Sequence, residues 1–316
     1  MEKEDLFYID DLRDVRYRGR FQHFQQVVCQ ELNATACSKI AHALERERKH
    51  SRTRSRPIDP LALARQAAGC LHVFIDAGAN IGMHTRFLFE PMRYPRSVFR
   101  RTFDATFGQQ DRRRVCSFGF EPNPAHADRH HRLQAYYAEH GFQYVYVPAA
   151  VGDRADNLTF YLNPTVAGGS SHSDWSFGMK SRELNASKQR SHVVPVIDFA
   201  AFLKALQAQG RPPDGRVVVK MDIEGAEFTV MMQLLLHGVL CNLVDFISVE
   251  WHHRFLPLPA AVNRSLRING SEGKLESWML QEAVHDSVGC RLKDLSTVDD
   301  ESYINDGAPL QWTTWP

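Results

Sequence analysis

The sequence lacks any apolar run that approaches the roughly 20 residues needed to cross a lipid bilayer. Apolar stretches such as 217–219 and 234–236 are far shorter, and Met1 is followed by Glu-Lys-Glu-Asp rather than by the apolar core of a signal peptide. We therefore expect no membrane span and no targeting segment in this sequence. On this basis we expect the protein to be located in the cytoplasm.

An excess of charge of either sign is also missing. Lysine and arginine number 38 and the acidic residues 37, so the formal net charge is +1. A chain without a strong overall field does not attract nucleic acid in general, and no nucleic-acid partner is expected. What the chain does have is 316 residues, of which 43% are hydrophobic. This predicts one large domain with appendages, because single cores stop growing at roughly 250–300 residues.

The cysteines lack the C-x-x-C spacing that is typical of zinc sites and redox centres. Cys116 and Cys241 lie in or beside apolar runs, where a thiol packs as a small hydrophobic group. We therefore expect reduced, structural cysteines rather than a disulfide framework. Five N-x-Ser/Thr triplets point the other way, and they begin at Asn33, Asn157, Asn185, Asn263 and Asn269. They are either a coincidence in polar loops or the mark of a lumenal domain of the secretory pathway.

The pattern of the chain changes near residue 70. In residues 21–44 apolar side chains recur every three or four positions, which predicts a helix with one face packed on the rest of the protein. Residues 45–57 are highly charged, have no apolar face and end in proline, which predicts a solvated basic linker. We expect residues 1–69 to form an N-terminal helical extension and linker, and residues 70–316 to form the main domain.

From residue 71 onward, short β-branched or aromatic runs alternate with helical stretches. This alternation is typical of an α/β fold in which a parallel sheet carries helices on both faces. The predicted strands cover residues 73–76, 115–120, 144–148, 217–222 and 245–250. The predicted helices cover residues 85–89, 125–140, 227–236 and 274–287.

Two inserts interrupt this alternation. Residues 92–114 mix arginines with aromatic residues, which indicates either a surface for acidic sugars or nucleic acid, or a solvated helix whose aromatic side chains turn inward. In residues 157–200, the strand-like runs 158–162 and 193–197 flank a loop that contains glycine and serine. They predict a β-hairpin-like insert that crosses the top of the sheet as a lid.

The run 73–82, Val-Phe-Ile-Asp-Ala-Gly-Ala-Asn-Ile-Gly, is a hydrophobic strand that leads directly into an acid and two glycines. Glycine lets the backbone turn sharply and lets a ligand lie against the main chain. A dinucleotide-binding loop would have the pattern G-x-G-x-x-G, whereas here Asp76 precedes Gly78 and Gly82. A carboxylate repels a pyrophosphate but suits a cofactor that carries a cationic sulfonium and an ammonium group.

Glu121 ends the next predicted strand, within the run Phe-Gly-Phe-Glu-Pro-Asn-Pro at 118–124. A carboxylate at a strand end can accept hydrogen bonds from both ribose hydroxyls of a nucleoside. We therefore predict that Glu121 binds a ribose. An acid that only stabilises a helix N-terminus is the alternative.

The run 217–227, Val-Val-Val-Lys-Met-Asp-Ile-Glu-Gly-Ala-Glu, places Asp222 at the end of a strand and Glu224 just beyond it. In open α/β sheets ligands bind beyond the carboxyl ends of the strands, so both acids are candidates for an acceptor site. Glu227 falls in the first turn of a predicted helix, where the helix dipole alone explains an acid.

The run 246–253, Phe-Ile-Ser-Val-Glu-Trp-His-His, ends another strand with Glu250, His252 and His253. A neutral imidazole at this place can take a proton from a hydroxyl, which makes His252 the candidate base, and a purely structural histidine is the alternative. A metal site that adds Asp222 to these residues stays open. No metal is assigned, because adjacent histidines point to opposite faces of an extended chain.

Four blocks in this order, DAGANIG, FEPNP, PAAVGD and KMDIEGAE, resemble the FkbM methyltransferase family. The likeness covers about residues 71–256, and it omits residues 1–69 and the insert 92–114. It implies the seven-stranded Rossmann-like sheet of class I methyltransferases, with helices on both faces. It also implies S-adenosylmethionine as the cofactor, and O-methylation of a hydroxyl on a sugar, a glycan or a small natural product.

The resemblance also implies which residues bind the cofactor, namely Asp76, Gly78, Asn80, Gly82, Glu121, Asn123, Ala150, Val151 and Asp153. It assigns no base, so Asp222, Glu224 and His252 remain candidates for catalysis from their positions alone. Two other classes stay open, a nicotinamide-dependent oxidoreductase and a non-catalytic module that keeps the fold. The identity of the acceptor, the need for a metal and the oligomeric state are left open as well.

Overall fold

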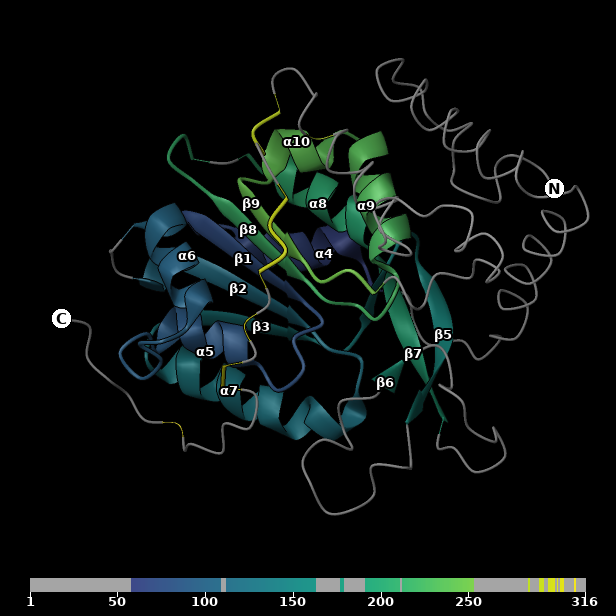
Figure 1. The fold of residues 1–316 in the computed structure, drawn as a ribbon, viewed down its shortest axis with the longest axis horizontal. Helices are drawn as coiled ribbons and strands as arrows, with labels where there is room; N and C mark the ends of the chain where they lie inside the picture. The colour runs from purple at the N-terminus through teal and green to yellow at the C-terminus, as the bar shows by residue number, and fades with distance from the viewer. Residues whose placement is uncertain are drawn as a thin grey trace, which may run out of the picture.

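The computed structural model describes the greater part of the predicted main domain (Figure 1). The described residues are 58–108, 112–162, 177–178, 191–210, 212–252, 284, 290–292, 295–298, 300, 302–303 and 310. The predicted helix at 21–44, the basic linker at 45–57, His253 and almost all of the predicted helix at 274–287 lie outside them. The domain boundary near residue 70 therefore stays a prediction.

A parallel sheet of five strands forms the centre of the molecule, in the order β3-β2-β1-β8-β9. The strands are β1 (His72–Ala77), β2 (Val115–Phe120), β3 (Gln143–Val147), β8 (Val217–Met221) and β9 (Phe246–Val249). Nearly all of their residues are buried, because helices cover both faces, and such strands appear in a sequence as short hydrophobic runs. All five predicted strands are confirmed to within one residue at each end.

The seven-stranded sheet is confirmed only for these five strands. Within the described residues, a further parallel bridge joins Ser248 of β9 to Ser296. It continues the sheet beyond β9 in the parallel sense. The predicted N-terminal helical extension falls mainly in residues 1–57 and is not confirmed.

Two layers of helices sandwich the sheet (Figure 1). One layer contains α4 (Pro60–Ala64), α8 (Phe199–Ala208), α9 (Glu227–Leu236) and α10 (Val239–Leu243), and the other contains α5 (Met83–Phe89), α6 (Val98–Phe107) and α7 (Ala127–Glu139). Short 3-10 turns occur at Arg65–Ala67, Arg112–Arg114 and Pro124–His126. Side chains of β1 alternate between the layers, since Val73 and Ile75 pack in the first core and Phe74 in the second. The predicted α/β class is confirmed.

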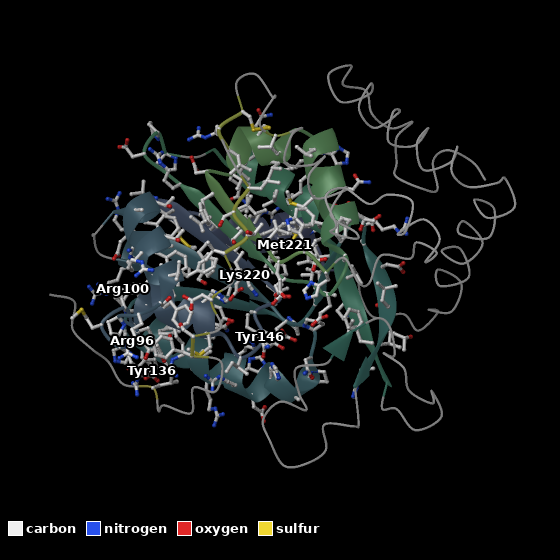
Figure 2. All side chains as sticks on the ribbon, viewed as in Figure 1. Arg96, Arg100, Tyr136, Tyr146, Lys220 and Met221 are labelled. Atoms are coloured by element: carbon white, nitrogen blue, oxygen red, sulfur yellow. A yellow bond between two sulfur atoms is a disulfide. The ribbon has the colours of Figure 1, made fainter. Side chains whose placement is uncertain are left out.

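The arginine-rich insert is a helix whose aromatic side chains turn inward, which was the second of the two interpretations. Phe99, Phe103 and Phe107 of α6 are buried in the core beneath it. Figure 2 shows Arg96 and Arg100 at the edge of the molecule. The aromatic residues of this insert are therefore part of the core rather than of a binding surface.

A second, smaller sheet lies beside the first (Figure 1). It has the order β4-β7-β5-β6 and consists of β4 (Ala150–Gly152), β5 (Asp156–Leu162), β6 (Phe177–Gly178) and β7 (Ser191–Asp198). The antiparallel pairing of β5 with β7 confirms the hairpin-like insert. The parallel pairing of β4 with β7 ties the insert to the chain that leaves β3. That the insert acts as a lid remains a prediction.

The prediction of reduced cysteines is wrong for four of them. Cys70 is bonded to Cys116 with Cα atoms 5.9 Å apart, and Cys241 is bonded to Cys290 with Cα atoms 4.3 Å apart. Sequence spacing gave no indication, because the partners are 46 and 49 residues apart. The fold brings them together. Cys70 lies two residues before β1 and Cys116 lies in the neighbouring β2, while the carbonyl oxygen of Cys241 accepts a backbone hydrogen bond from Arg291, next to Cys290.

None of the helices that the structure describes is long and apolar enough to cross a membrane.

Candidate cofactor and acceptor site

The candidate site lies where the order of strands reverses. From β1 the chain proceeds to β2 and β3 on one side, and it returns to β8 and β9 on the other side of β1. In doubly wound sheets the loops diverge at this point and leave a crevice beyond the carboxyl ends of the two strands. Asp76 of β1 is paired in register with Lys220 of β8, so the predicted acids of both strands reach the same edge.

Gly78 is required by a close approach of two backbone segments. Its φ of +82° is in the left-handed region, and a Cβ atom at this position would lie 1.7 Å from the carbonyl oxygen of Asp222. The amide of Asp222 donates to the carbonyl oxygen of Ala77 at 2.9 Å, which holds the two segments together. The glycine that the sequence assigned to the cofactor is therefore needed first by the fold. Gly82 is similar, because a Cβ there would lie 2.6 Å from Leu133 in α7.

Glu121 fastens the loop after β1 to the end of β2. One carboxylate oxygen accepts from the amide of Asn80 and the other from the amide of Asn123, both at 2.7 Å. Its side chain is buried, and burial raises the pKa of Glu121 to about 8, although the two amides and the charge of Lys220 oppose the rise. A carboxylate oxygen has two lone pairs, so each oxygen can accept a further hydrogen bond from a ligand.

Asn80 is held in a left-handed conformation, with φ of 49°. Nε2 of His130 lies 2.7 Å from the Asn80 carbonyl oxygen, and Nδ1 lies 2.6 Å from the Tyr144 hydroxyl. Burial lowers the pKa of His130 to about 4, so the ring is neutral, and it donates to the carbonyl and accepts from the hydroxyl. The loop is thereby fixed from the side of α7 as well.

Asp76 is the most unusual residue of the site. Its side chain is completely buried, and neither carboxylate oxygen has a hydrogen-bond partner among the described residues. Nδ1 of His84 lies 3.9 Å from Oδ2 of Asp76, and burial lowers the pKa of His84 to about 3, so this ring is neutral. Burial raises the pKa of Asp76 to about 7, against the charge of Lys220. Buried polar groups without partners are rare in folded proteins, and they call for an explanation such as a ligand that supplies the missing donors.

Lys220 links the two halves of the site. Its ammonium group donates to the carbonyl oxygen of Gly78 at 3.1 Å and to Oδ2 of Asp222 at 3.0 Å. Figure 2 shows this side chain near the middle of the molecule. Lys220 and Asp222 are two residues apart, so their side chains leave the strand on the same side. The contact of Lys220 with Gly78 depends on the pairing of β8 with β1.

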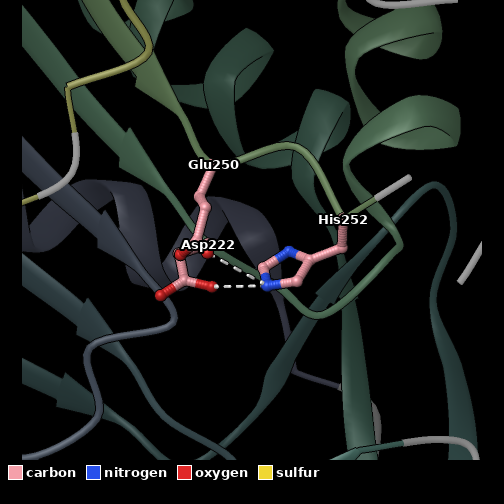
Figure 3. Close-up of side chains that lie close together, drawn as sticks. All are labelled: Asp222, Glu250 and His252. Carbon is pink, nitrogen blue, oxygen red and sulfur yellow. Dashed lines mark ion pairs between the residues drawn. The ribbon is translucent and has the colours of Figure 1, made fainter. Parts of the chain in front are cut away.

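The three catalytic candidates, Asp222, Glu224 and His252, do come together (Figure 3 for two of them). Nε2 of His252 lies 3.8 Å from Oδ1 of Asp222 and 3.8 Å from Oε2 of Glu224. Oε1 of Glu250 lies 3.4 Å from the same nitrogen. One imidazole nitrogen thus faces three carboxylates from two strand ends.

Glu227 has a role that the sequence analysis missed. It is completely buried, accepts hydrogen bonds from the amides of Ile223 and Gly225, and lies 2.9 Å from Nδ1 of His252. The sequence analysis explained this acid by the helix dipole alone, and the dipole does not account for these contacts. The available indication was the acid itself, three residues after Glu224 in the KMDIEGAE block, but its histidine partner is 25 residues away.

The contacts of Glu227 set the charge of His252. Burial lowers the pKa of His252, but the hydrogen bond to Glu227 and the charges of Glu227, Glu224 and Asp222 outweigh it and raise the pKa to about 9. The imidazole is therefore protonated at neutral pH in the protein alone. A protonated ring attracts the neighbouring carboxylates, but it cannot accept a proton.

Other predicted cofactor residues have structural roles in the described contacts. Asn123 caps the 3-10 turn Pro124–His126, and its Oδ1 accepts from the amide of Ala125 at 3.0 Å. Ala150 and Val151 of β4 are buried in two different apolar clusters. For these residues and for Asp153, cofactor binding stays a prediction.

The sequence model of the methyltransferase FkbM domain matches residues 76–273. The match begins at Asp76 and includes Glu121, Asp222, Glu224 and His252. No curated protein and no solved structure matches the chain.

Proposed function

Because the chain belongs to the FkbM methyltransferase family, we propose that it is an S-adenosylmethionine-dependent O-methyltransferase. Its acceptor is a hydroxyl of a sugar, a glycan or a small natural product. The observation that carries the proposal is the buried Asp76 carboxylate, which has no hydrogen-bond partner among the described residues. It lies near the carboxyl end of β1, where the order of strands in the sheet reverses.

The residues on the β1 and β2 side fit this cofactor. When bound, S-adenosylmethionine supplies a methyl group on a positively charged sulfur, and it also carries an ammonium group and a ribose. Asp76 offers a buried negative charge to a cationic group, and Glu121 offers two oxygens with free lone pairs to ribose hydroxyls. A pyrophosphate would meet the Asp76 carboxylate at the start of the loop, which disfavours a nicotinamide dinucleotide.

The residues on the β8 and β9 side fit a hydroxyl acceptor. Asp222 and Glu224 are partly exposed, with 26% and 30% of their side chains accessible, so an acceptor can reach them. We assign them to orienting the hydroxyl and taking up its proton. His252 is held by Glu227 at Nδ1 and faces both carboxylates with Nε2.

Titration calorimetry with S-adenosylmethionine and with NAD tests the cofactor assignment. We expect the wild type to bind S-adenosylmethionine in preference to NAD, and Glu121→Gln to bind it about 10- to 100-fold more weakly, because a hydrogen bond to a charged group contributes about 1.5–3 kcal/mol. Glu139→Gln, an equally mild change at an exposed position of α7, is the matched control and should bind as the wild type does. Preference for NAD, or unchanged binding by Glu121→Gln, would remove the assignment.

The acceptor class needs a separate measurement. A donor with a labelled methyl group, incubated with the protein and with carbohydrate or lipid extracts, should give labelled product that resists mild base, as methyl ethers do and methyl esters do not. Binding of the cofactor without any transfer would favour a non-catalytic module.

The compartment is a further proposal. The sequence favoured the cytoplasm and kept the secretory lumen as the alternative, and we now propose the lumen. The bonds Cys70–Cys116 and Cys241–Cys290 support it, because disulfides persist in oxidising compartments. The sequon at Asn157 lies on β5, where the asparagine is partly exposed.

Mass spectrometry of the native protein, digested without reduction, tests this. We expect a peptide pair joined through Cys241 and Cys290, which disappears on reduction, and a glycan on Asn157. Complete alkylation of both cysteines without a reductant, together with an unmodified Asn157, would contradict the lumen and favour the cytoplasm as the compartment.

A further inference from the structure

A mixed set of carboxylate and imidazole groups lies beside the proposed cofactor loop. Asp222, Glu250 and His252 each present one ligand atom, and these three atoms all lie within 4.8 Å of one another. Figure 3 shows the two carboxylates converging on the imidazole ring. We propose that these three residues bind a divalent cation of the Mn²⁺ type, which in turn holds the acceptor hydroxyl. Its role towards the acceptor rests on the proposed function.

The distances between the three groups leave room for a shared ion. For metal–ligand bonds of about 2.1 Å, adjacent ligand atoms are about 3 Å apart and opposite ones about 4.2 Å apart. Nε2 of His252 is 3.4 Å from Oε1 of Glu250 and 3.8 Å from Oδ1 of Asp222. Both values fall between these limits, and 3.8 Å is too long for a hydrogen bond. The two carboxylate oxygens lie within 4.8 Å of each other, so a bound ion would draw them slightly together.

The imidazole is oriented for ligation, and a cation that binds Nε2 displaces the proton from that nitrogen to solvent. His252 is 5% exposed, and its Nδ1 lies 2.9 Å from the buried carboxylate of Glu227, which turns Nε2 towards Asp222 and Glu250. Histidine ligands of metals are usually held in this way by a carboxylate on the other ring nitrogen, which fixes the tautomer and makes the ligand more basic. Glu227 is therefore a positioning residue for the site rather than a ligand.

The donor set and its exposure indicate the kind of ion. Carboxylates suit Mg²⁺, Ca²⁺ and Mn²⁺, and imidazole suits transition metals, so two carboxylates with one imidazole favour a transition ion that accepts oxygen ligands. The Asp222 and Glu250 side chains are 26% and 36% exposed, which leaves one side of the cluster open to solvent. Three protein ligands with open positions are typical of catalytic rather than structural metal sites.

A cation at this place would do what the carboxylates alone do poorly. Asp222 and Glu224 are weak bases towards a sugar hydroxyl, because such a hydroxyl is far less acidic than a carboxyl group. A divalent cation polarises a bound hydroxyl and lowers its pKa, so that the proton can pass to a nearby carboxylate or to water. Glu224, with Oε2 3.8 Å from Nε2 of His252, lies beside the site to receive it.

The test is titration of the full chain, stripped with chelator, with Mn²⁺ alone. We expect one saturable site by calorimetry, weakened at least tenfold in Glu250→Gln and in Asp222→Asn, and unchanged in Glu139→Gln. Pulsed electron paramagnetic resonance of the Mn²⁺-loaded wild type should show coupling to a ligand nitrogen, and that coupling should be lost in His252→Gln. Glu227→Gln should weaken binding about 10- to 100-fold with the coupling retained.

Circular dichroism of each variant separates a lost ligand from a lost fold, and the nitrogen coupling of the wild type needs no variant to fold. Absence of saturable binding, or a wild type without nitrogen coupling, overturns the metal site. Titration of the same samples with S-adenosylmethionine keeps the two hypotheses apart. If that cofactor binds and Mn²⁺ does not, only the metal site fails, and if neither the cofactor nor its transfer activity is found, the proposed function fails even where Mn²⁺ binds.

Discussion

Replacing Gly78 with alanine is expected to destabilise the fold by more than about 4 kcal/mol, a large share of the roughly 5–15 kcal/mol that holds a typical domain together. The new Cβ would lie 1.7 Å from the Asp222 carbonyl oxygen, and the φ of +82° is unfavourable for any residue with a side chain. Neither backbone segment can move easily, because β1 and β8 are paired along their length. Urea unfolding followed by circular dichroism, together with the yield of soluble protein, measures the effect.

Gly210→Ala is the matched control for this prediction. Gly210 has a similar φ of +76°, but nothing lies within 4 Å of the position that a Cβ would take. The free energy of unfolding of Gly210→Ala should fall only by what a left-handed conformation costs an alanine, about 1–2 kcal/mol. Equal losses in the two variants would show that backbone strain alone, and not the contact with Asp222, explains the glycine.

This distinction also decides which variants report on the cofactor. A change at Gly78 removes cofactor binding by removing the fold, so it carries no information about the ligand. Glu121 and Asp76 carry that information, because their carboxylates have acceptor capacity that the described residues do not use. The sequence assigned all three residues to one function, and the structure separates the architectural residue from the two that fit a ligand.

The parts of the fold that the sequence predicted well depend on neighbouring residues in the chain. β1, β2, β8 and β9 were visible because a strand buried on both faces is a short apolar run that ends at a polar group. The same logic placed Asp76 and Asp222 at one edge of the sheet. It works because parallel strands in such folds end on the same side.

The parts that the sequence did not predict depend on pairs that are distant in the chain. The contact of Glu227 with His252, the two disulfides and the pairing of β4 with β7 join residues that no local pattern connects. Each residue had a sufficient local explanation: a helix dipole for Glu227, small apolar packing for Cys116. Only the three-dimensional arrangement shows that these explanations were incomplete.

Asp76→Asn is expected to weaken S-adenosylmethionine binding by about 100-fold or more without loss of stability. Removing one member of a buried ion pair costs about 3–5 kcal/mol, which corresponds to this factor in the dissociation constant. In the protein alone the carboxylate is buried without a hydrogen-bond partner among the described residues, so the neutral amide should be tolerated at least as well. Calorimetry measures the first effect, and urea unfolding without cofactor measures the second.

The pH dependence of stability gives this prediction its sharpest form. Burial raises the pKa of Asp76 from 3.8 to about 7, so the folded protein holds a proton that the unfolded chain has already released. The wild type should therefore lose stability relative to Asp76→Asn as the pH rises from about 4 to about 7, and the difference should stay constant above that range. Asp214→Asn, at an exposed position, should show no such divergence. If Asp76→Asn is instead less stable than the wild type at neutral pH, the Asp76 carboxylate is stabilised by a group of the protein itself. It would then not be available to bind a cationic cofactor, and the assignment of Asp76 would fail.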